Sequence, residues 1–311
     1  MTTHIICCGI SVLDRVWPLP ELPTCGGKYH ASDYLELGGG MAANAAVAAA
    51  RLGAQTAYWG RGGDDSAGQV MQQEMAAYGV DVRHFRLCAG VRSSVSAILV
   101  ANDGERMIVN FRDAGMPKDA DWLPLDDVRA CQAVLADIRW VEGACSLYEK
   151  ARALGIPTVI DAEKADAVAF TTLLPLVDHA IFSDPGLRSF TGGAALNDDA
   201  SRIKALKKVR ALGCRVAAVT LGAQGTLWLD DAGVHRQAAF TVKAVDTTGA
   251  GDVFHGAYTL AIGEGQTVTQ AMRFASAVAA LKCTRRGGRA GIPSRAEVDL
   301  FLAEQAALTQ N

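Results

Sequence analysis

The sequence predicts an α/β protein with a mostly parallel sheet, helices on both of its faces and a small second sheet beside it. Short apolar runs typical of buried strands alternate along the chain with longer, helix-like segments. This alternation is typical of parallel sheets that are covered on both faces. Two polar, strand-containing segments, at about 12–36 and 91–112, interrupt the pattern and predict the second sheet.

The expected elements follow in order along the chain. The expected strands are runs of five to seven residues, at 4–10, 56–60, 95–101, 106–111, 133–138, 157–161, 179–183 and 216–222. The expected helices are longer and several stop at a glycine: 41–53, 66–79, 142–155, 198–212, 251–262, 267–283 and 294–307. Asn102-Asp103-Gly104 predicts a hairpin between two of the strands, and further strand character lies near 28–36.

The two interruptions leave the α/β core and return to it, so we expect one domain over 1–311. Together they form a small β lid over the carboxyl ends of the main strands. Ligands bind at that edge in open α/β folds.

Composition excludes several classes of protein. With 33 acidic and 30 basic residues, the net charge of −3 argues against nucleic-acid binding by phosphate neutralisation. Hydrophobic residues make up 50% of the chain, which predicts a large core. The longest uncharged stretches, such as 37–50, stop at 14 residues, fewer than the roughly 18 that span a bilayer. No basic residue precedes the first apolar run, so we expect a cytoplasmic protein without a signal peptide or a membrane partner.

The eight cysteines are dilute, and several lie inside apolar runs. The chain has no Cys-x-x-Cys pair, so a zinc site is not expected. We interpret the cysteines as reduced thiols, mostly in the core.

The most informative segment is Asp246-Thr-Thr-Gly-Ala-Gly-Asp252, which leads into an apolar helix. Gly249 and Gly251 allow a tight turn and a close approach to a ligand. The helix that follows directs free N–H groups and a positive dipole end at the same point, which suits a phosphoryl group. Asp252, in the first helical turn, is placed to take a proton from an attacking hydroxyl. For such a glycine-rich turn alone, a simple helix cap is the competing interpretation.

Other glycine clusters give this segment a context, and together they resemble the PfkB, or ribokinase-like, carbohydrate kinases. GGGMAANAAVAAARLG followed by GRGGDDSAGQ is similar to the first family signature, and DTTGAGDVFHGA to the second. Thr220-Leu-Gly-Ala-Gln-Gly225 and Gly288-Arg-Ala-Gly291 follow in the family's order. The resemblance covers essentially the whole chain, and GxxxxGK[ST] is missing from the sequence, so a P-loop kinase is not predicted.

The resemblance implies a three-layer αβα sandwich with a β lid, and phosphorylation of a sugar hydroxyl with ATP and Mg²⁺. It assigns the catalytic base to Asp252 and the anion hole to Gly249, Ala250 and Gly251. It also assigns sugar hydroxyls to Asp14, Gly39, Gly40 and Asn44, and the nucleotide to Thr220, Gly222 and Gly225.

One segment departs from the family pattern. The family often has Asn-x-x-Glu, which helps to place Mg²⁺ through water, after the strand expected at 179–183. Here the chain reads Ser183-Asp184-Pro185-Gly186. Either Asp184 substitutes, or the metal relies on ATP oxygens and water, as Mg²⁺ often does. We therefore assign no metal residue.

Three residues bear on the acceptor: Lys28, Asn110 and Arg139, all expected at the mouth of the sugar site. Two cations suit a sugar that ends in a tetrahedral anion, whereas a neutral sugar needs neither. The competing interpretation is a solvated lid lysine and a charge at a helix edge.

A closer resemblance concerns the sulfofructose kinases. It rests on CGI-x-V-x-DR, GGKY, GER-x-I-x-N, LAD-x-RW and VAALKCTR-x-GGRAGIP. In that branch a lysine, an asparagine and an arginine hold the sulfonate, which matches Lys28, Asn110 and Arg139. The resemblance implies phosphorylation of 6-deoxy-6-sulfofructose at its 1-hydroxyl.

Three alternatives stay open. They are a kinase of fructose 6-phosphate, fructose or a keto-deoxy sugar acid, a non-catalytic regulator that keeps the fold, and a nicotinamide oxidoreductase. The last lacks a Gly-x-Gly-x-x-Gly turn after the first strand. Because lid strands often pair in this family, we expect a homodimer through the lid. The residues do not decide whether a monovalent cation activates the protein.

Overall fold

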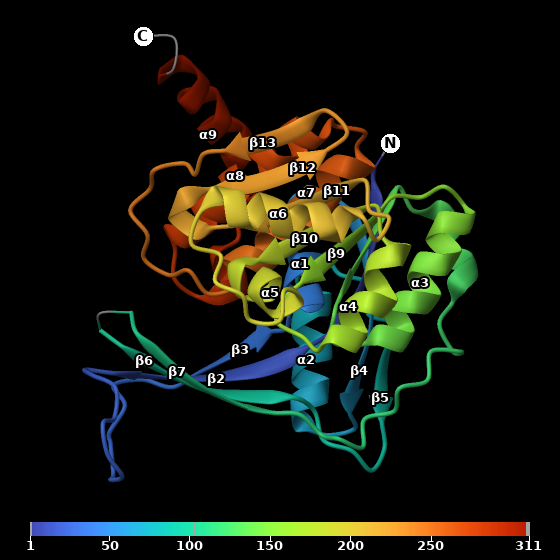
Figure 1. The fold of residues 1–311 in the computed structure, drawn as a ribbon. Coiled ribbons are helices and arrows are strands. Elements are labelled where there is room, and N and C mark those ends of the chain that lie inside the picture. The colour runs from blue at the N-terminus through green and yellow to red at the C-terminus, as the bar shows by residue number, and fades with distance from the viewer. Residues whose placement is uncertain (1, 103, 309–311) are drawn as a thin grey trace.

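The computed structural model describes residues 2–102 and 104–308 and contains two sheets of unequal size (Figure 1). The order of the larger sheet is β13-β12-β11-β10-β9-β8-β1-β4-β5. Its strands from β5 to β11 are parallel, whereas β12 and β13 are antiparallel and form one edge. The bounds are β1 (His4–Ile10), β4 (Gln55–Gly63), β5 (Phe85–Cys88), β8 (Ala133–Asp137), β9 (Thr158–Ala162), β10 (His179–Ser183), β11 (Val216–Thr220), β12 (Thr226–Asp230) and β13 (Gly233–Gln237). The predicted parallel sheet is confirmed, with an added antiparallel hairpin.

Helices cover both faces of this sheet, each over its own buried core. One layer holds α1 (Met41–Arg51), α2 (Ser66–Ala77), α7 (Ala250–Gly263), α8 (Val268–Cys283) and α9 (Arg295–Leu308). The other holds α3 (Val141–Ala153), α4 (Ala167–Leu173), α5 (Asp184–Phe190) and α6 (Asp199–Arg210). Because side chains alternate along a strand, β1 sends Ile5 and Cys7 into the first core and Ile6 and Cys8 into the second.

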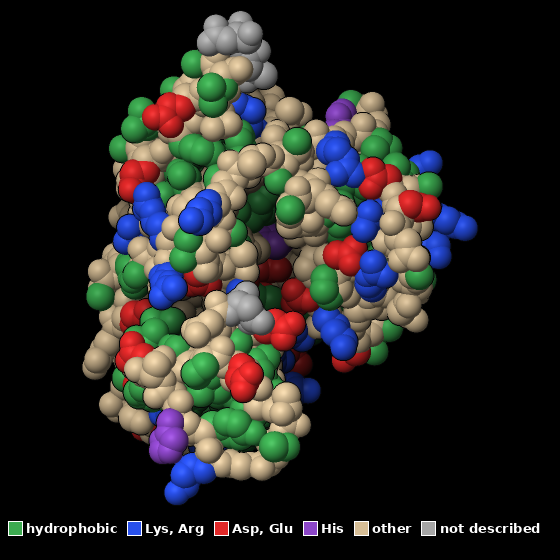
Figure 2. All heavy atoms as spheres, turned by 90° about the vertical axis from the view of Figure 1, so that its left-hand side faces the viewer, with side chains coloured by type: hydrophobic (Ala, Val, Ile, Leu, Met, Phe, Trp, Pro, Cys, Tyr) green, Lys and Arg blue, Asp and Glu red, His purple; other side chains and the backbone are tan. Residues whose placement is uncertain are grey.

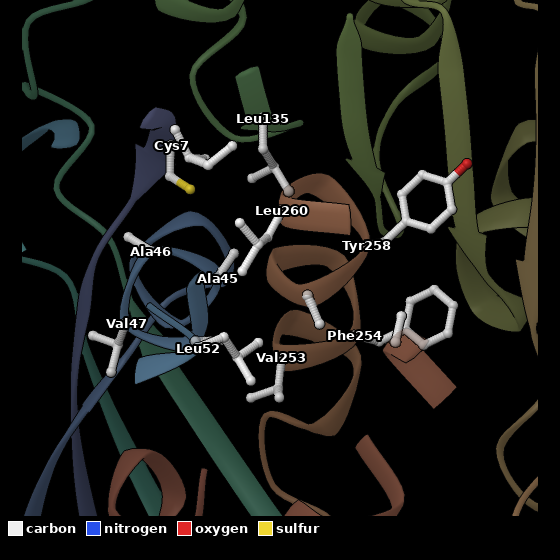
Figure 3. Packing of buried hydrophobic residues seen from close by; sticks show 14 of the residues in the cluster. Cys7, Ala45, Ala46, Val47, Leu52, Leu135, Val253, Phe254, Tyr258 and Leu260 are labelled. Carbon is white, nitrogen blue, oxygen red and sulfur yellow. The ribbon is translucent and has the colours of Figure 1, made fainter. Parts of the chain in front are cut away.

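Two helices of the first layer, α1 and α7, pack side by side and position the site (Figure 3). Alanines fill the facing side of α1, and Ala45 lies opposite α7 in this view. At Gly256 of α7 an added Cβ would lie 2.3 Å from the Ala45 carbonyl oxygen, so only glycine permits this approach. The close packing brings the first turn of α7 next to the first turn of α1.

The second sheet has the order β3-β2-β6-β7. Its strands are β2 (Val12–Leu19), β3 (Leu35–Gly39), β6 (Val95–Ala101) and β7 (Arg106–Phe111). β2 starts two residues after the end of β1, so the second sheet extends from the carboxyl end of the main sheet. The predicted small sheet is therefore present, and it is built from the two expected segments.

The strand expected near 28–36 is wrong in its bounds. The chain from 20 to 34 forms no strand, and β3 starts at Leu35 because its partner in β2 is the stretch Val12–Val16. The predicted hairpin strands match β6 and β7, although Asp103 in its turn lies outside the described residues.

All eight cysteines are free thiols, five of them buried, whereas Cys25 is exposed. A bilayer-spanning helix is absent from the part of the chain that the structure describes.

Candidate active site

A cavity of about 320 Å³ lies between the second sheet, the start of α1, the loop before α7 and the turn at 286–292. Its lining includes Asp14 and Arg106 from the second sheet, Asn44 from α1, and Thr248 and Gly249 from the loop before α7. Figure 2 shows this face of the molecule hollowed, with acidic side chains gathered in the hollow.

Asn44 lines this cavity and contacts Asp252, which is not itself among the lining residues. Gly249 adopts the left-handed conformation with φ 71°, and α7 begins at the next residue, which places Asp252 in its first turn. The Asn44 Nδ2 donates to Asp252 Oδ2 at 2.7 Å. Burial, reinforced by the charge of Asp161, raises the pKa of Asp252 to about 7, although the Asn44 bond opposes the rise. A carboxylate with that pKa is suited to accept a proton near neutral pH.

The predicted anion hole lies beside Asp252. An added Cβ at Gly251 would meet no atom within 4 Å among the described residues, so this glycine borders open space. The Ala250 N–H donates to the Thr247 carbonyl at 3.2 Å, a bond with which a bound oxyanion would compete. The positive end of the 14-residue helix α7 points to the same place.

The structure brings together the four residues predicted to bind sugar hydroxyls. Asp14 lies against Gly39, where an added Cβ would be 2.2 Å from Asp14 Oδ2. Gly40 has φ 93° and precedes α1, which carries Asn44. Burial raises the pKa of Asp14, whereas a hydrogen bond from Ser96 opposes the rise.

Arg289 holds this group from behind and was not among the predicted site residues. It is only 2% exposed, and its Nε donates to Asn44 Oδ1 at 2.8 Å. Its Nη2 donates to the Gly39 carbonyl at 3.0 Å, and its Nη1 pairs with Glu74 at 3.1 Å. Because the guanidinium only donates, it fixes the Asn44 amide with its NH₂ group toward Asp252.

Asp137, at the end of β8, ties the surrounding elements together. Its Oδ2 accepts from the Ile10 and Ala42 N–H groups at 2.7 and 3.1 Å, and its Oδ1 accepts from the Arg139 N–H at 2.8 Å. It therefore joins the ends of β1 and β8 to the start of α1. This is the point where the chain order of the sheet reverses, a common ligand position.

His255, which the sequence predicts to be a packing residue, is buried in α7. Its Nδ1 lies 2.7 Å from the Gly251 carbonyl oxygen and 3.4 Å from Asp161 Oδ2, and its Nε2 lies 3.2 Å from the Ile181 carbonyl oxygen. The ring thus packs directly under the glycine-rich turn.

The three residues predicted to contact nucleotide form the turn between β11 and β12. Gly222 and Gly225 have φ of 55° and 82°, which favour glycine, and Thr220 ends β11. At Gly225 an added Cβ would lie 2.0 Å from the Gln237 carbonyl oxygen. None of the three lines the 320 Å³ cavity, so their nucleotide contacts stay a prediction.

Lys28, Asn110 and Arg139 do not line that cavity either. Lys28 is exposed on the segment between β2 and β3, which projects from the body (Figure 1), and Asn110 is exposed on β7. Arg139 is half-buried, and its buried Nε has no hydrogen-bond partner among the described residues. Arg112, an exposed residue that the sequence analysis does not name, lies near enough for its charge to interact with that of Arg139. Burial lowers the pKa of Arg112, and the charge of Arg139 lowers it further.

Asp184 is already paired. Ser183 caps α5, and Asp184 Oδ2 accepts from Arg188 Nε at 2.7 Å, while Arg202 lies 3.5 Å from its other oxygen. The described residues hold no group of three or more His, Cys, Asp or Glu that fits a metal ion. Asp184 is engaged by two arginines, so we assign no metal residue to this segment.

Arg106 links the second sheet to the glycine-rich loop. Its guanidinium donates to the hydroxyls of Thr247 and Thr248 at 2.7 and 2.8 Å. The only sequence signal for this contact is the Gly104-Glu-Arg106 segment at the start of β7.

Comparisons with known proteins agree with this geometry. The model of the pfkB family carbohydrate kinases matches residues 2–295. A ribokinase of Haemophilus influenzae is 29% identical over 93% of this chain and 95% of its own, and a fructoselysine 6-kinase of Shigella flexneri is 32% identical over 78% and 88%. A solved Agrobacterium tumefaciens protein, assigned as a ribokinase, aligns with a TM-score of 0.92 at 34% identity over 99% of both chains.

Proposed function

Because the chain belongs to the PfkB family of carbohydrate kinases, phosphotransferases that use ATP with Mg²⁺, we propose that it phosphorylates the 1-hydroxyl of 6-deoxy-6-sulfofructose. The products are the sugar 1-phosphate and ADP. The observation that carries the choice of acceptor is the pair of guanidinium groups of Arg112 and Arg139. They lie at the ends of β7 and β8, next to Asp137.

In the proposed reaction, Asp252 takes the proton of the acceptor hydroxyl as its oxygen attacks the terminal phosphorus of ATP. The bond from that phosphorus to the bridging oxygen breaks, and ADP leaves with the electron pair. Asn44 orients the carboxylate, and the first turn of α7 with Gly249–Gly251 stabilises the phosphoryl oxygens. Mg²⁺, when bound with ATP, neutralises phosphate charge.

The remaining assignments belong to the same proposal. Asp14, Gly39, Gly40 and Asn44 hold sugar hydroxyls, and Thr220, Gly222 and Gly225 contact the nucleotide. The chain acts as one domain over 1–311, with segments 12–36 and 91–112 as its lid.

The anionic end of the acceptor is supported by electrostatics. Beyond partial desolvation, the charge of Arg139 lowers the pKa of Arg112 although Asp137 opposes it, so the exposed Arg112 and the half-buried Arg139 repel each other. The buried Arg139 Nε also lacks a partner among the described residues. A sulfonate bound between them would relieve both costs, and Lys28 and Asn110 complete the proposed set.

A second candidate is a kinase of another acceptor, such as fructose, fructose 6-phosphate or a keto-deoxy sugar acid. It is favoured by the cavity itself, whose lining includes Asp14 and Asn44 but not Lys28, Asn110 or Arg139. The carboxylate of Asp14 and the amide of Asn44 can hydrogen-bond to the hydroxyls of any sugar.

An acceptor panel assayed by ADP release with ATP and Mg²⁺ tests the proposal. We expect sulfofructose to be turned over with the highest kcat/KM. Arg139→Ala should lower that value about 10- to 150-fold, as expected for a lost charged hydrogen bond, and leave the KM for ATP unchanged. Arg129→Ala, which alters an exposed arginine on the same face of the sheet as α3, is the control and should have no effect.

An equal loss for neutral and anionic acceptors in Arg139→Ala would make Arg139 a structural residue. A preference of the unmodified enzyme for fructose would favour the second candidate.

We also propose that two chains associate through the second sheet. Strand β7 leaves Met107, Ile108 and Val109 exposed, by 42%, 51% and 65%. Met107 and Val109 lie on one face of this outer strand and suit a covered interface, whereas Ile108 lies on the opposite face and lines the cavity.

A further inference from the structure

Lys282 in the last turn of α8 is completely buried, with an exposed fraction of 0%. Lysine is almost never buried to this extent unless its charge is paired, because the ammonium loses its hydration. The buried ammonium of Lys282, in the same helical layer as the active site, therefore requires a paired charge or hydrogen-bond acceptors.

The partner is Asp246, the first residue of the glycine-rich segment. Lys282 Nζ donates to the Asp246 carbonyl oxygen at 3.0 Å and lies 3.6 Å from its Oδ2. The N–H groups of Val245 and Asp246 in turn donate to the Cys283 carbonyl at 2.7 and 3.1 Å. The end of α8 thus holds the start of this segment by both charge and backbone.

The Asp246 carboxylate also forms hydrogen bonds to two further loops. Its Oδ1 accepts from the Thr248 N–H at 2.9 Å, one residue before the left-handed Gly249. Its Oδ2 accepts from the Gly287 N–H at 3.2 Å, which leads into the turn Gly288–Gly291 that carries Arg289. One carboxylate therefore anchors the loop that starts α7 and the loop that orients Asn44.

We propose that Lys282 is a positioning residue for phosphoryl transfer, and that its ammonium fixes Asp246 and thereby the loop Thr247–Gly251 at the start of α7. The inference rests on the proposed kinase reaction, and it adds a function for a residue that touches neither substrate. Arg106 binds the same loop from the second sheet, so two cations contact it. Burial lowers the pKa of Lys282, and the charge of Arg106 contributes to the lowering.

The geometry explains why a cation is needed at this position. Without it, the Asp246 carbonyl oxygen would lose its hydrogen bond from the ammonium, and the partly buried carboxylate would lose its paired charge. An oxygen facing an apolar gap is costly, so the segment would shift toward water. A shift of about 1 Å at a phosphoryl site can lower the rate 10²-fold.

The test compares Lys282→Met, Lys282→Ala and Lys282→Arg. We expect Lys282→Met to lower kcat at least about tenfold with little change in the KM of the acceptor, because the loop acts in the transfer step. Lys282→Arg keeps the charge and should retain more activity than Lys282→Met. Lys243→Met, which changes an exposed lysine three residues before Asp246, should behave as the unmodified enzyme.

Chemical rescue distinguishes a missing charge from a damaged core. Lys282→Ala leaves room for a small cation, so added methylammonium should raise its kcat. The same salt should not raise the kcat of the unmodified enzyme or of Lys282→Met, whose side chain fills the space. A full kcat in Lys282→Met, or a loss in Lys282→Ala that methylammonium leaves unchanged, would overturn the proposal.

Amide hydrogen exchange gives a readout that does not depend on identifying the acceptor. In Lys282→Met the amides of 246–251 should exchange faster, whereas the strands of the main sheet should be unchanged. If no acceptor is turned over, the proposed reaction fails, but this exchange still tests the position of the loop. Unchanged exchange at 246–251 would overturn the role of Lys282. If Lys282→Met does not fold, the same comparison with Asp246→Asn applies.

Discussion

The raised pKa of Asp252 makes it a better base, and it also lowers the stability of the fold when the carboxyl group ionises. The environment of Asp252 resists ionisation, because the carboxyl group is partly withdrawn from water and lies close to Asp161. The same resistance makes it a stronger base at neutral pH than an ordinary aspartate. The geometry around it, with Asn44 fixed by Arg289, then decides which oxygen is free to take the proton.

We predict that kcat/KM rises with pH through an ionisation near 7, because only the deprotonated Asp252 accepts a proton. Asp252→Asn should lower kcat by about 10²–10⁴-fold and abolish this limb of the profile. Steady-state kinetics from pH 5.5 to 8.5 measures both. A variant that keeps more than about a tenth of kcat would remove Asp252 from the role of base.

Asp252→Asn should raise the stability of the fold although it lowers kcat. The pKa of Asp252 is higher in the folded chain, about 7, than the ordinary value of 3.8, so protonation favours the fold. The stability it contributes is complete below pH 3.8 and is lost as the pH rises through about 7. From pH 5.5 to 8, Asp252→Asn should therefore gain roughly 1–2 kcal/mol relative to the unmodified protein in urea unfolding. No gain would mean that Asp252 ionises at an ordinary pH.

Gly251 offers a clean test of the anion hole. An added Cβ there would enter open space, and the backbone does not need a positive φ, so Gly251→Val should fold normally. We expect it to lose most of its turnover, because the side chain occupies the place of the transferring phosphoryl group. Thermal unfolding and ADP release distinguish the two effects, and Gly53→Val, on a surface turn with open space but φ 98°, shows the cost of strain alone. Normal turnover in Gly251→Val would place the phosphoryl group elsewhere.

At the scale of elements, the catalytic loop depends on two neighbours that do not adjoin it in sequence. Helix α8 contacts it from inside through Lys282, and strand β7 contacts it from the second sheet through Arg106. The second sheet is thereby connected to the start of α7. The position of the lid and the position of the catalytic loop are consequently linked by two hydrogen bonds.

We predict that Arg106→Met lowers kcat/KM for the acceptor about tenfold or more, because both threonine hydroxyls lose a charged donor. The thermal midpoint should change little, since the bonds lie at the edge of the cavity. Arg92→Met, at an exposed arginine before β6, serves as the control. Unchanged kcat/KM in Arg106→Met would show that the lid and the loop act independently.

Local patterns explain how much of these elements the sequence could predict. The helix expected at 41–53 is observed at Met41–Arg51, because alanines and Gly53 determine it within the segment itself. The position of β3 could not be predicted, because it depends on pairing with a distant strand. Asp252, Asn44 and Arg289 all lie in sequence motifs, but the contact of Arg289 with Asn44 joins residues 245 apart and could not be predicted from them. Single charged residues such as Arg289, Arg112 and Lys282 show their partners only once the chain has folded.

At the scale of the whole molecule, the outer strand β7 is the most exposed apolar edge of the second sheet. We predict that the protein is a dimer in solution, and that Val109→Glu shifts it to a monomer by placing two like charges in the interface. Sedimentation equilibrium measures the change, and Val234→Glu, on the exposed edge strand β13, is the matched control. A monomeric unmodified protein would contradict the proposed interface.

The distribution of the thiols provides a means of observing the lid directly. Burial raises the pKa of the Cys131 thiol to about 12 and that of Cys214 to about 11, so these sulfurs resist alkylation at neutral pH. Cys25 instead lies exposed on the projecting segment between β2 and β3. A maleimide dye should therefore label Cys25 first without altering the sequence. Its fluorescence would then report movement of the lid as sugar and nucleotide are added.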